Sequence, residues 1–458
     1  MRRIYLLLLL LCTFSSPAFA KVDAGIDELV TSYQEYSGFS GTLLVVENDE
    51  VILSRAVGYA DDAALKPIAM NTRFDIGSIQ KNLTAVLVLQ AVDRKLLQLN
   101  DTLDAFALEF KDPRTENITI QQLLEHRSGF SDIFTAEYRE NPSRYNSIDK
   151  KLALLSEQAL LFTPGTDRRY SNYGYIVLGA VLEKVTGKSY WELVEQNLLQ
   201  PSREALEGAQ MDAEESDLAE PYHFNFEGKR IAVTANKVEH RSPDGGGEMS
   251  ILELYAFYHQ LFNANQFLSK IGLQTFKSMQ DNQQQWLAFG GGRGISTAVE
   301  LDFDNDIWVL VLANTDRLVA EKLSSRVRSY FVTGEYNNVS IPPEVFTYRF
   351  YQRKGEEFFS NEFQSVYQKV GYKTFIGKTV TNLARELIAS QKAEESIFFF
   401  RYLTTLYPDA AEVYDGLAFG YFSSGDAAKA RDSFEKARKL KPNYESQFNS
   451  SNYEVESD

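Results

Sequence analysis

Two groups of predicted strands, one early and one late in the chain, most constrain how this sequence can fold. The early group, "GTLLVVENDEVILSRAVGYAD" (41–61), has two β-rich runs around Asn48-Asp49, which is a hairpin signal. In the late group (285–314), "GISTAVELDF" alternates, "DND" turns the chain, and "IWVLVLAN" is a buried run. Helical and loop segments fill the interval, so we predict one α+β domain whose sheet pairs early with late strands, rather than repeated βαβ units. This domain is expected to end near residue 335.

The size and composition of the chain limit its class. Its 458 residues exceed what one hydrophobic core usually serves, so two or more domains are expected. The 44% of hydrophobic residues exclude a mostly disordered chain. The formal net charge of −16 argues against nucleic-acid or membrane-surface partners, because an acidic surface repels phosphates and anionic headgroups.

The N-terminal segment, "MRRIYLLLLLLCTFSSPAFA", has the layout of a secretory signal peptide over residues 1–20, with Ala18-Phe19-Ala20 as the cleavage signal. A membrane anchor is the weaker alternative, because the apolar run is far shorter than the roughly 20 residues of a spanning helix. The single cysteine, Cys12, lies inside this segment, which excludes disulfides and thiol catalysis in the mature chain. We therefore predict a periplasmic or secreted protein without membrane insertion after leader removal.

From residue 377 the sequence predicts helices with a repeat. Pro408 and Pro442 stand 34 residues apart, a spacing that resembles tetratricopeptide helix pairs. Matching apolar positions in the two copies are Leu383 and Leu417, Leu387 and Tyr421, Phe400 and Phe434, and Leu403 and Ala437. Two copies are fewer than the three usually needed, so we expect them to pack on residues 336–376 or on the first domain. A groove for a protein partner and a stiffening appendage are both open.

The predicted order of segments follows from these patterns. It is a signal peptide (1–20), an α+β domain (21–335), a connecting segment (336–376), helical repeats (377–442) and a polar acidic tail (443–458).

The motif Ser-x-x-Lys occurs three times, at Ser78/Lys81, Ser147/Lys150 and Ser433/Lys436. Ser433 falls on a repeat helix, and Ser147 is explained as the N-cap of an ordinary helix. Ser78 differs, because the helix in "FDIGSIQKNLTAVLVLQAV" (74–92) is apolar on most faces and should be buried. Residues three apart share a helix face, so Lys81 is expected beside the Ser78 hydroxyl and could activate it as a nucleophile. A capping Ser78 with Lys81 reaching the surface is the alternative.

A second element is Tyr170-Ser171-Asn172, in the loop before an apolar helix of "FTPGTDRRYSNYGYIVLGAVLEKVTGKSYWELV" (162–194). A phenol held near cations can serve as a general base, and an amide can orient a substrate and a lysine. Tyr-x-Asn recurs at Tyr336-Asn338, so context decides between the two. The four histidines show no metal-ligand spacing, and neither a metal nor a cofactor is expected.

Together these stretches, with "LLEHRSGFSD" (123–132) and "GGGEMSILELYAF" (245–257), resemble the serine β-lactamase and penicillin-binding-protein group, in its branch of class C β-lactamases, D-amino-acid peptidases and family VIII esterases. The resemblance covers about residues 25 to 335. It implies a β-lactamase/transpeptidase-like antiparallel sheet flanked by helices, with a helical insertion, followed here by the all-α region.

Carried over to this sequence, the resemblance implies Ser78 as the acylated nucleophile, Lys81 as its activating partner, Tyr170 as general acid/base and Asn172 as a positioning group. The oxyanion hole would be the backbone N–H of Ser78 and one from the strand at Gly292.

The third motif departs from the family. Where the family has Lys-Thr-Gly or His-x-Gly, this chain reads Phe289-Gly290-Gly291-Gly292-Arg293. Phe289 therefore takes the place of the family's basic residue. Gly291 and Gly292 would let a substrate approach closely. Arg293 could bind a substrate carboxylate instead of the missing cation, or it could face solvent.

Two functions follow. The first is an exported serine hydrolase that cleaves an ester or an amide in a small-molecule or peptide substrate through an acyl-enzyme at Ser78. The second is a catalytically weak, hydrolase-like binding protein that works through its helical repeats. We favour the enzyme, because a buried lysine is costly to keep without a use.

Overall fold

The computed structural model describes residues 17–206, 218–234, 238–442, 444 and 446. Most of the predicted signal peptide, including Cys12, lies outside the described residues, as does most of the predicted tail. Helix α1 (Pro17–Ser37) already includes Ala20, so cleavage there would remove its first turn. Within the described part of the chain, every helix is too short or too polar to cross a membrane.

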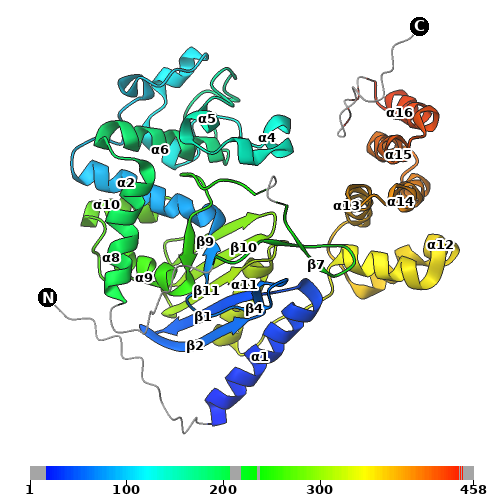
Figure 1. Ribbon diagram of the computed structural model, residues 1–458, viewed down its shortest axis with the longest axis horizontal. Coiled ribbons are helices and arrows are strands. Elements are labelled where there is room, and N and C mark those ends of the chain that lie inside the picture. The colour runs from blue at the N-terminus through cyan, green and yellow to red at the C-terminus, as the bar shows by residue number, and fades with distance from the viewer. Residues whose placement is uncertain (1–16, 207–217, 235–237, 443, 445, 447–458) are drawn as a thin grey trace. The chain divides into compact units, whose positions relative to one another are not determined.

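A five-stranded antiparallel sheet with the order β2-β1-β11-β10-β9 forms the centre of the first unit (Figure 1). Its strands are β1 (Gly41–Glu47), β2 (Glu50–Val57), β9 (Gln285–Gly292), β10 (Ile295–Asp302) and β11 (Ile307–Ala313). The early strand β1 pairs with the late strand β11, from Gly41↔Ala313 to Glu47↔Ile307, which confirms the predicted sheet.

The turn between β1 and β2 explains why these strands pair locally. Asn48 and Asp49 have φ angles of 51° and 62°, the left-handed conformation that a two-residue hairpin turn requires. Asn and Asp tolerate this conformation better than other residues with side chains, so the turn fixes the register of the hairpin.

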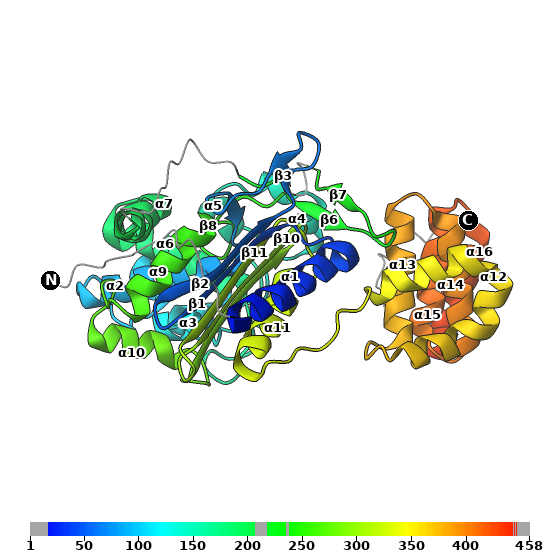
Figure 2. The same ribbon diagram turned by 90° about the horizontal axis from the view of Figure 1, so that it is seen from below.

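Both faces of the sheet are covered by helices (Figures 1 and 2). One face packs on α1 and α11 (Val319–Thr333), with Leu43 and Val45 of β1 in that core. The other face, with Leu44 and Val46, packs in a larger core. This core includes α2 (Gln80–Asp93), α6 (Asn172–Thr186) and α9 (Ile251–Phe262). Alternate side chains of a strand point to opposite faces, so one apolar run fills two cores.

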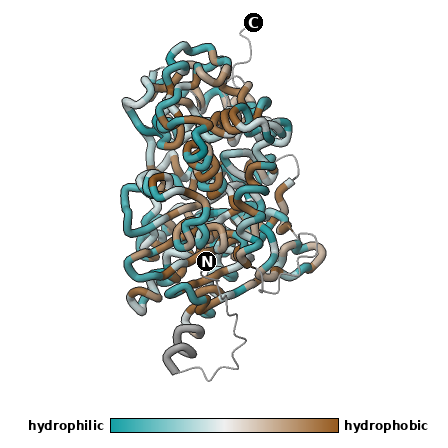
Figure 3. The backbone as a smooth tube through the Cα atoms, turned by 90° about the vertical axis from the view of Figure 1, so that its left-hand side faces the viewer, coloured by the Kyte–Doolittle hydropathy of each residue, from teal (hydrophilic) through white to brown (hydrophobic). Residues whose placement is uncertain are grey.

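Short elements surround this frame. The remaining strands are β3 (Tyr59–Asp61), β4 (Lys66–Pro67), β5 (Arg73–Asp75), β6 (Tyr222–Phe224), β7 (Arg230–Ala232) and β8 (Glu248–Ser250). The remaining helices of this unit are η1 (Gly77–Ile79), η2 (Leu103–Phe106), η3 (Pro113–Asn117), α3 (Ile120–Leu124), α4 (Ala136–Glu140), η4 (Pro142–Arg144), α5 (Ile148–Leu152), α7 (Tyr190–Val194), η5 (Glu195–Leu199), α8 (Gln200–Ala205) and α10 (Lys270–Ser278). Figure 3 shows hydrophobic stretches mainly inside the trace and hydrophilic loops at its edges.

The chain divides into two compact units, Met1–Phe224 with Arg230–Val339, and Asn225–Lys229 with Ser340–Asp458. The helices of the second unit are α12 (Pro343–Val370), α13 (Ile376–Ala389), α14 (Ala393–Leu406), α15 (Ala411–Ser423) and α16 (Ala427–Leu440). Helix α12 is broken at Gly355, whose φ is 78°, so the predicted connecting segment is itself helical.

The second unit has its own hydrophobic core, in which α12 contributes Phe359, Phe363 and Tyr367. All eight apolar residues that match between the two predicted copies are buried in this core. Packing on residues 336–376 is therefore as expected, because α12 covers helices that two repeats alone would leave exposed. The all-helical arrangement is consistent with tetratricopeptide pairs, and that assignment stays a prediction.

Candidate active site

Ser78 lies on the single-turn helix η1, between the short strand β5 and the buried helix α2. The turn is held by Asp75, whose Oδ1 accepts a hydrogen bond of 2.7 Å from the N–H of Gly77. Gly77 has a φ of 51°, and a Cβ there would lie 2.9 Å from the backbone nitrogen of Gly291. A glycine is therefore required at this position, because strand β9 runs directly beside the turn that carries Ser78.

Lys81 sits one helical turn after Ser78 and is only 6% exposed. Its Nζ donates to Ser78 Oγ (3.0 Å), to Asn172 Oδ1 (2.7 Å) and to the carbonyl oxygen of Asp244. These three contacts fix the amine in direction as well as in place.

Tyr170 approaches Ser78 from a different part of the chain. Its hydroxyl donates to Ser78 Oγ at 2.9 Å, while its side chain is 49% exposed. Lys81 Nζ lies 5.1 Å from the centre of the Tyr170 ring. The Ser78 oxygen thus contacts an amine on its buried side and a phenol that is open to solvent.

Asn172 connects this group to an acidic residue. It is the first residue of α6, which is capped by the Ser171 hydroxyl accepting from the N–H of Gly174 (3.3 Å). Its carbonyl oxygen faces Lys81, and its Nδ2 donates to both carboxylate oxygens of Asp132, at 3.0 and 3.2 Å. Asp132 therefore fixes which end of the amide points to the lysine.

The other two Ser-x-x-Lys pairs have local roles. Ser147 Oγ accepts from the N–H of Lys150 (3.3 Å) as the N-cap of α5, as expected. Ser433 Oγ donates back to the carbonyl of Lys429 (2.7 Å) within α16. The second Tyr-x-Asn differs too, since Tyr336 packs beside the core of α1 and α11.

Strand β9 forms one wall of the site. A Cβ at Gly290 would collide with the carbonyl oxygen of Ile76 and with Thr297 Oγ1, so the strand can lie this close only as glycine. Gly291 and Gly292 are exposed and line the same cavity as Ser78.

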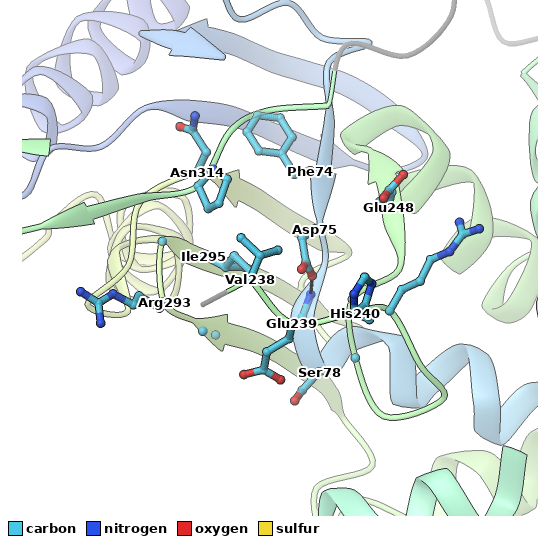
Figure 4. A pocket seen from close by; sticks show the side chains of 18 of the residues that line it. Phe74, Asp75, Ser78, Val238, Glu239, His240, Glu248, Arg293, Ile295 and Asn314 are labelled. Carbon is cyan, nitrogen blue, oxygen red and sulfur yellow. Dashed lines mark hydrogen bonds between the residues drawn. The ribbon is translucent and has the colours of Figure 1, made fainter. Parts of the chain in front are cut away.

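The two side chains that flank these glycines differ in what they contact. Phe289 is half-buried, packs against the core of α1 and α11, and also lines a cavity next to Tyr170. Arg293 is exposed, and Figure 4 shows its guanidinium pointing away from Ser78. Arg293 lines the same cavity as Ser78, but its guanidinium does not reach the nucleophile.

Residues that the sequence analysis did not assign to the site also surround it. The His126 ring lies 4.5 Å from the Tyr170 ring, and its Nδ1 accepts from the N–H of Ser171 (3.3 Å). Burial, followed by the charges of Lys81 and Arg168, lowers the pKa of His126 to about 4. His126 is thus neutral at ordinary pH. The stretch "LLEHRSGFSD" contains both His126 and Asp132, and it was the only signal for them in the sequence.

Cavities open on two sides of Ser78. One of about 320 Å³ is lined by Ser78, Asn172, Asp75 and by Gly291 and Gly292 of β9 (Figure 4). The other, of about 370 Å³, is lined by Ser78, Lys81, Tyr170, His126 and Phe289. A substrate centred on Ser78 can therefore extend in two directions.

The antiparallel sheet, its helices and the lysine-linked serine define a protein of the β-lactamase/transpeptidase-like class. The model of the family described as beta-lactamase matches residues 26–328. The chain belongs to this family, whose members are generally serine hydrolases.

Relatives and solved structures agree with this placement. The chain is 30% identical over 302 residues to the probable fimbrial assembly protein FimD, serogroup H1, of Dichelobacter nodosus, covering 60% of this chain and 74% of that protein. It is 26% identical over 180 residues to penicillin-binding protein 4* of Bacillus subtilis, covering 39% of each.

Among solved structures, the penicillin-binding protein from Bacillus halodurans matches with a TM-score of 0.58 and 23% identity, covering 66% of this chain and all of that one. The D-amino acid amidase from Ochrobactrum anthropi SV3 matches with a TM-score of 0.56 and 17% identity, covering 69% and 99%. At these identities the likeness shows the fold alone.

Proposed function

We propose that this protein is a serine hydrolase that cleaves an ester or an amide through an acyl-enzyme at Ser78. The observation that carries the proposal is the pair of hydrogen bonds on Ser78 Oγ, from Lys81 Nζ at 3.0 Å and from Tyr170 Oη at 2.9 Å. A hydroxyl held between two groups that can carry a proton is the arrangement of an activated nucleophile.

The mechanism follows from this geometry. Ser78 Oγ attacks the carbonyl carbon of the substrate while the Lys81–Tyr170 pair, with Lys81 as a neutral amine, takes up the Ser78 proton. Tyr170 is open to solvent, so it can deliver the proton to the leaving alcohol or amine as the acyl-enzyme forms. Water then attacks the carbonyl carbon of the acyl-enzyme, and its proton passes through Tyr170 to Ser78 Oγ. The bond between Ser78 Oγ and the acyl group breaks, which releases the acid and restores free Ser78.

Backbone groups would stabilise the charge that develops on the substrate oxygen. We assign this role to the N–H of Ser78 and to an N–H of β9 at Gly291 or Gly292, since β9 packs directly against η1. Asn172, fixed by Asp132 and Lys81, would orient the substrate.

The substrate class is narrowed by Phe289. An apolar ring stands where the family carries a cation, and Arg293 points away, so a substrate carboxylate has no cation to meet on β9 among the described residues. Esters and neutral amides are therefore better candidates than β-lactams, which carry a carboxylate.

An activity-based probe tests the nucleophile. A fluorophosphonate should label the wild type and spare Ser78→Ala. Ser147→Ala and Ser433→Ala are matched controls, because each removes the serine of another Ser-x-x-Lys pair, and both should label like the wild type. Equal labelling of Ser78→Ala and the wild type would refute the proposal.

We also propose that residues 1–20 are a signal peptide and that the protein is periplasmic or secreted. The support is the basic, apolar and Ala-x-Ala order of the segment. Expression of the full gene in a bacterial host should give a mature chain that begins at Lys21, as measured by mass spectrometry. A chain that keeps residues 1–20 after export would contradict this.

A second candidate function is a catalytically weak protein that binds a partner through its predicted helical repeats, α13–α16, and Phe289 is the observation that favours it. This candidate expects no turnover of p-nitrophenyl esters or nitrocefin by the full chain. Robust turnover that is lost in Ser78→Ala would exclude it.

A further inference from the structure

The cavity on the Asn172 side of Ser78 has an acidic interior. Its described lining includes the carboxyl groups of Asp75, Glu239, Asp244 and Glu248. Its apolar walls include Phe74, Phe134, Val238 and Ile295. With a volume of about 320 Å³, it can hold an alkyl chain with a small polar end.

The fixed cations of the described lining are occupied or directed elsewhere. Lys151 is 2% exposed and donates to Ser242 Oγ (2.8 Å) and to the carbonyl of His240 (3.0 Å), with Asp244 Oδ1 at 3.9 Å. The guanidinium of Arg241 stacks 4.6 Å from the Trp191 ring. Arg293 points away from the cavity in Figure 4.

Glu239 is the carboxylate best placed to meet a substrate. It comes from the exposed segment before Asp244, and its carboxylate accepts a hydrogen bond of 3.0 Å from the buried Tyr138 hydroxyl. Figure 4 shows its carboxylate on the same side of the opening as the Ser78 hydroxyl. Glu248 differs, because it lies farther from Ser78 in this view and has Arg73 at 3.9 Å.

We propose that this cavity selects substrates that carry an alkylammonium group, with Glu239 as the specificity-determining residue. The inference rests on the proposed hydrolase function of Ser78 and extends it to a substrate class. An ammonium group on an alkyl chain would fit the apolar walls and would gain from the negative charge of the Glu239 carboxylate. A carboxylate in the same place would be repelled.

Two pairs of isosteric esters test the proposal, because each pair differs only in charge. The first pair puts the charge on the acyl side: p-nitrophenyl 4-(trimethylammonio)butanoate against p-nitrophenyl 5,5-dimethylhexanoate. The second puts it on the alcohol side: choline butanoate against 3,3-dimethylbutyl butanoate, followed by acid release. In at least one pair, the wild type should prefer the cationic ester in kcat/KM by about tenfold.

Glu239→Gln should bring this ratio to near one, since the amide keeps the shape and the contact with Tyr138 but loses the charge. Glu248→Gln is the matched control, and it should keep most of the preference. The cationic and neutral esters are compared within each variant, so loss of folded protein affects both equally.

The outcomes separate this inference from the proposed function. If the wild type hydrolyses neutral esters through Ser78 but shows no cationic preference in either pair, the inference is wrong and the hydrolase proposal stands. A preference that survives in Glu239→Gln would also overturn it. If the wild type hydrolyses none of the four esters and resists the fluorophosphonate, the proposed function itself fails.

Discussion

Asp75 offers a test of the site's electrostatics that is independent of any substrate. Burial, with the charges of Glu239 and Glu248 adding to it, raises the pKa of the Asp75 carboxyl from 3.8 to about 7, against the opposing hydrogen bond from the N–H of Gly77. The native protein therefore binds a proton at Asp75 more tightly than the unfolded chain does.

The sign of the pH effect follows from this linkage. Between pH 3.8 and about 7, the native state holds more protons than the unfolded state, so the free energy of unfolding falls as the pH rises. Each pKa unit corresponds to about 1.4 kcal/mol. From about pH 5.5 to about pH 8.5 the wild type should lose about 2 kcal/mol through Asp75 alone.

Asp75→Asn removes this titration while its amide oxygen can still accept from Gly77. Urea unfolding at several pH values gives the free energy of each protein, and the difference between wild type and variant cancels all other titrating groups to a first approximation. Tryptophan fluorescence is a suitable signal, because Trp191, Trp286 and Trp308 are the only tryptophans and all lie in the first unit.

Relative to the wild type, the free energy of unfolding of Asp75→Asn should rise by about 2 kcal/mol from about pH 5.5 to about pH 8.5. Glu239→Gln should retain most of the wild-type slope, since burial and not Glu239 is the first cause of the shift. A difference between wild type and Asp75→Asn that does not change with pH would refute the reasoning.

Three further predictions concern the same site. Tyr170→Phe should lower kcat on p-nitrophenyl butanoate by about 10²- to 10⁴-fold, because it removes the hydroxyl that carries a proton to and from Ser78. The thermal midpoint should stay near that of the wild type, because the Tyr170 ring is half-exposed. A decrease in kcat of less than tenfold would argue against this role. His126→Leu should lower kcat about tenfold, because it removes the ring that packs against Tyr170 at 4.5 Å. The pH profile of the wild type should show no His126 titration between about pH 5.5 and pH 8, because the pKa of His126 is about 4. An intact kcat in the variant would show that this contact does not position Tyr170. Gly290→Ala should destabilise the first unit by about 1–3 kcal/mol in urea unfolding, because the added Cβ meets Ile76 and Thr297. Gly291→Ala should change this free energy of unfolding by less than about 0.5 kcal/mol, because the nearest atom to its added Cβ is 3.8 Å away. Equal effects of the two substitutions would contradict the packing of β9 on η1.

Several parts of this protein could be read from the sequence, because each depends on neighbours in the chain. The turn at Asn48-Asp49 and the alternating strands predicted the sheet that the structure shows. The spacing of Ser78 and Lys81 placed them on one face of a helix, since three residues are nearly one turn. The cap at Ser147 was equally local.

Other parts depended on tertiary packing. Tyr170 reaches Ser78 across 92 residues of sequence, and Asp132 and Asp244 reach Asn172 and Lys81 in the same way. No local pattern encodes such distances, because they depend on how α2, α6 and β9 pack. The direction of Arg293 and the acidic cavity around Glu239 belong to this group.

The sequence by itself determined the early hairpin, the alternating late strands and one serine–lysine pair, because helix pitch, strand alternation and turn conformation act over a few residues. Only the tertiary structure decided which side chains surround that pair and which charges line its cavities, because these contacts join segments that packing of the two cores brings together.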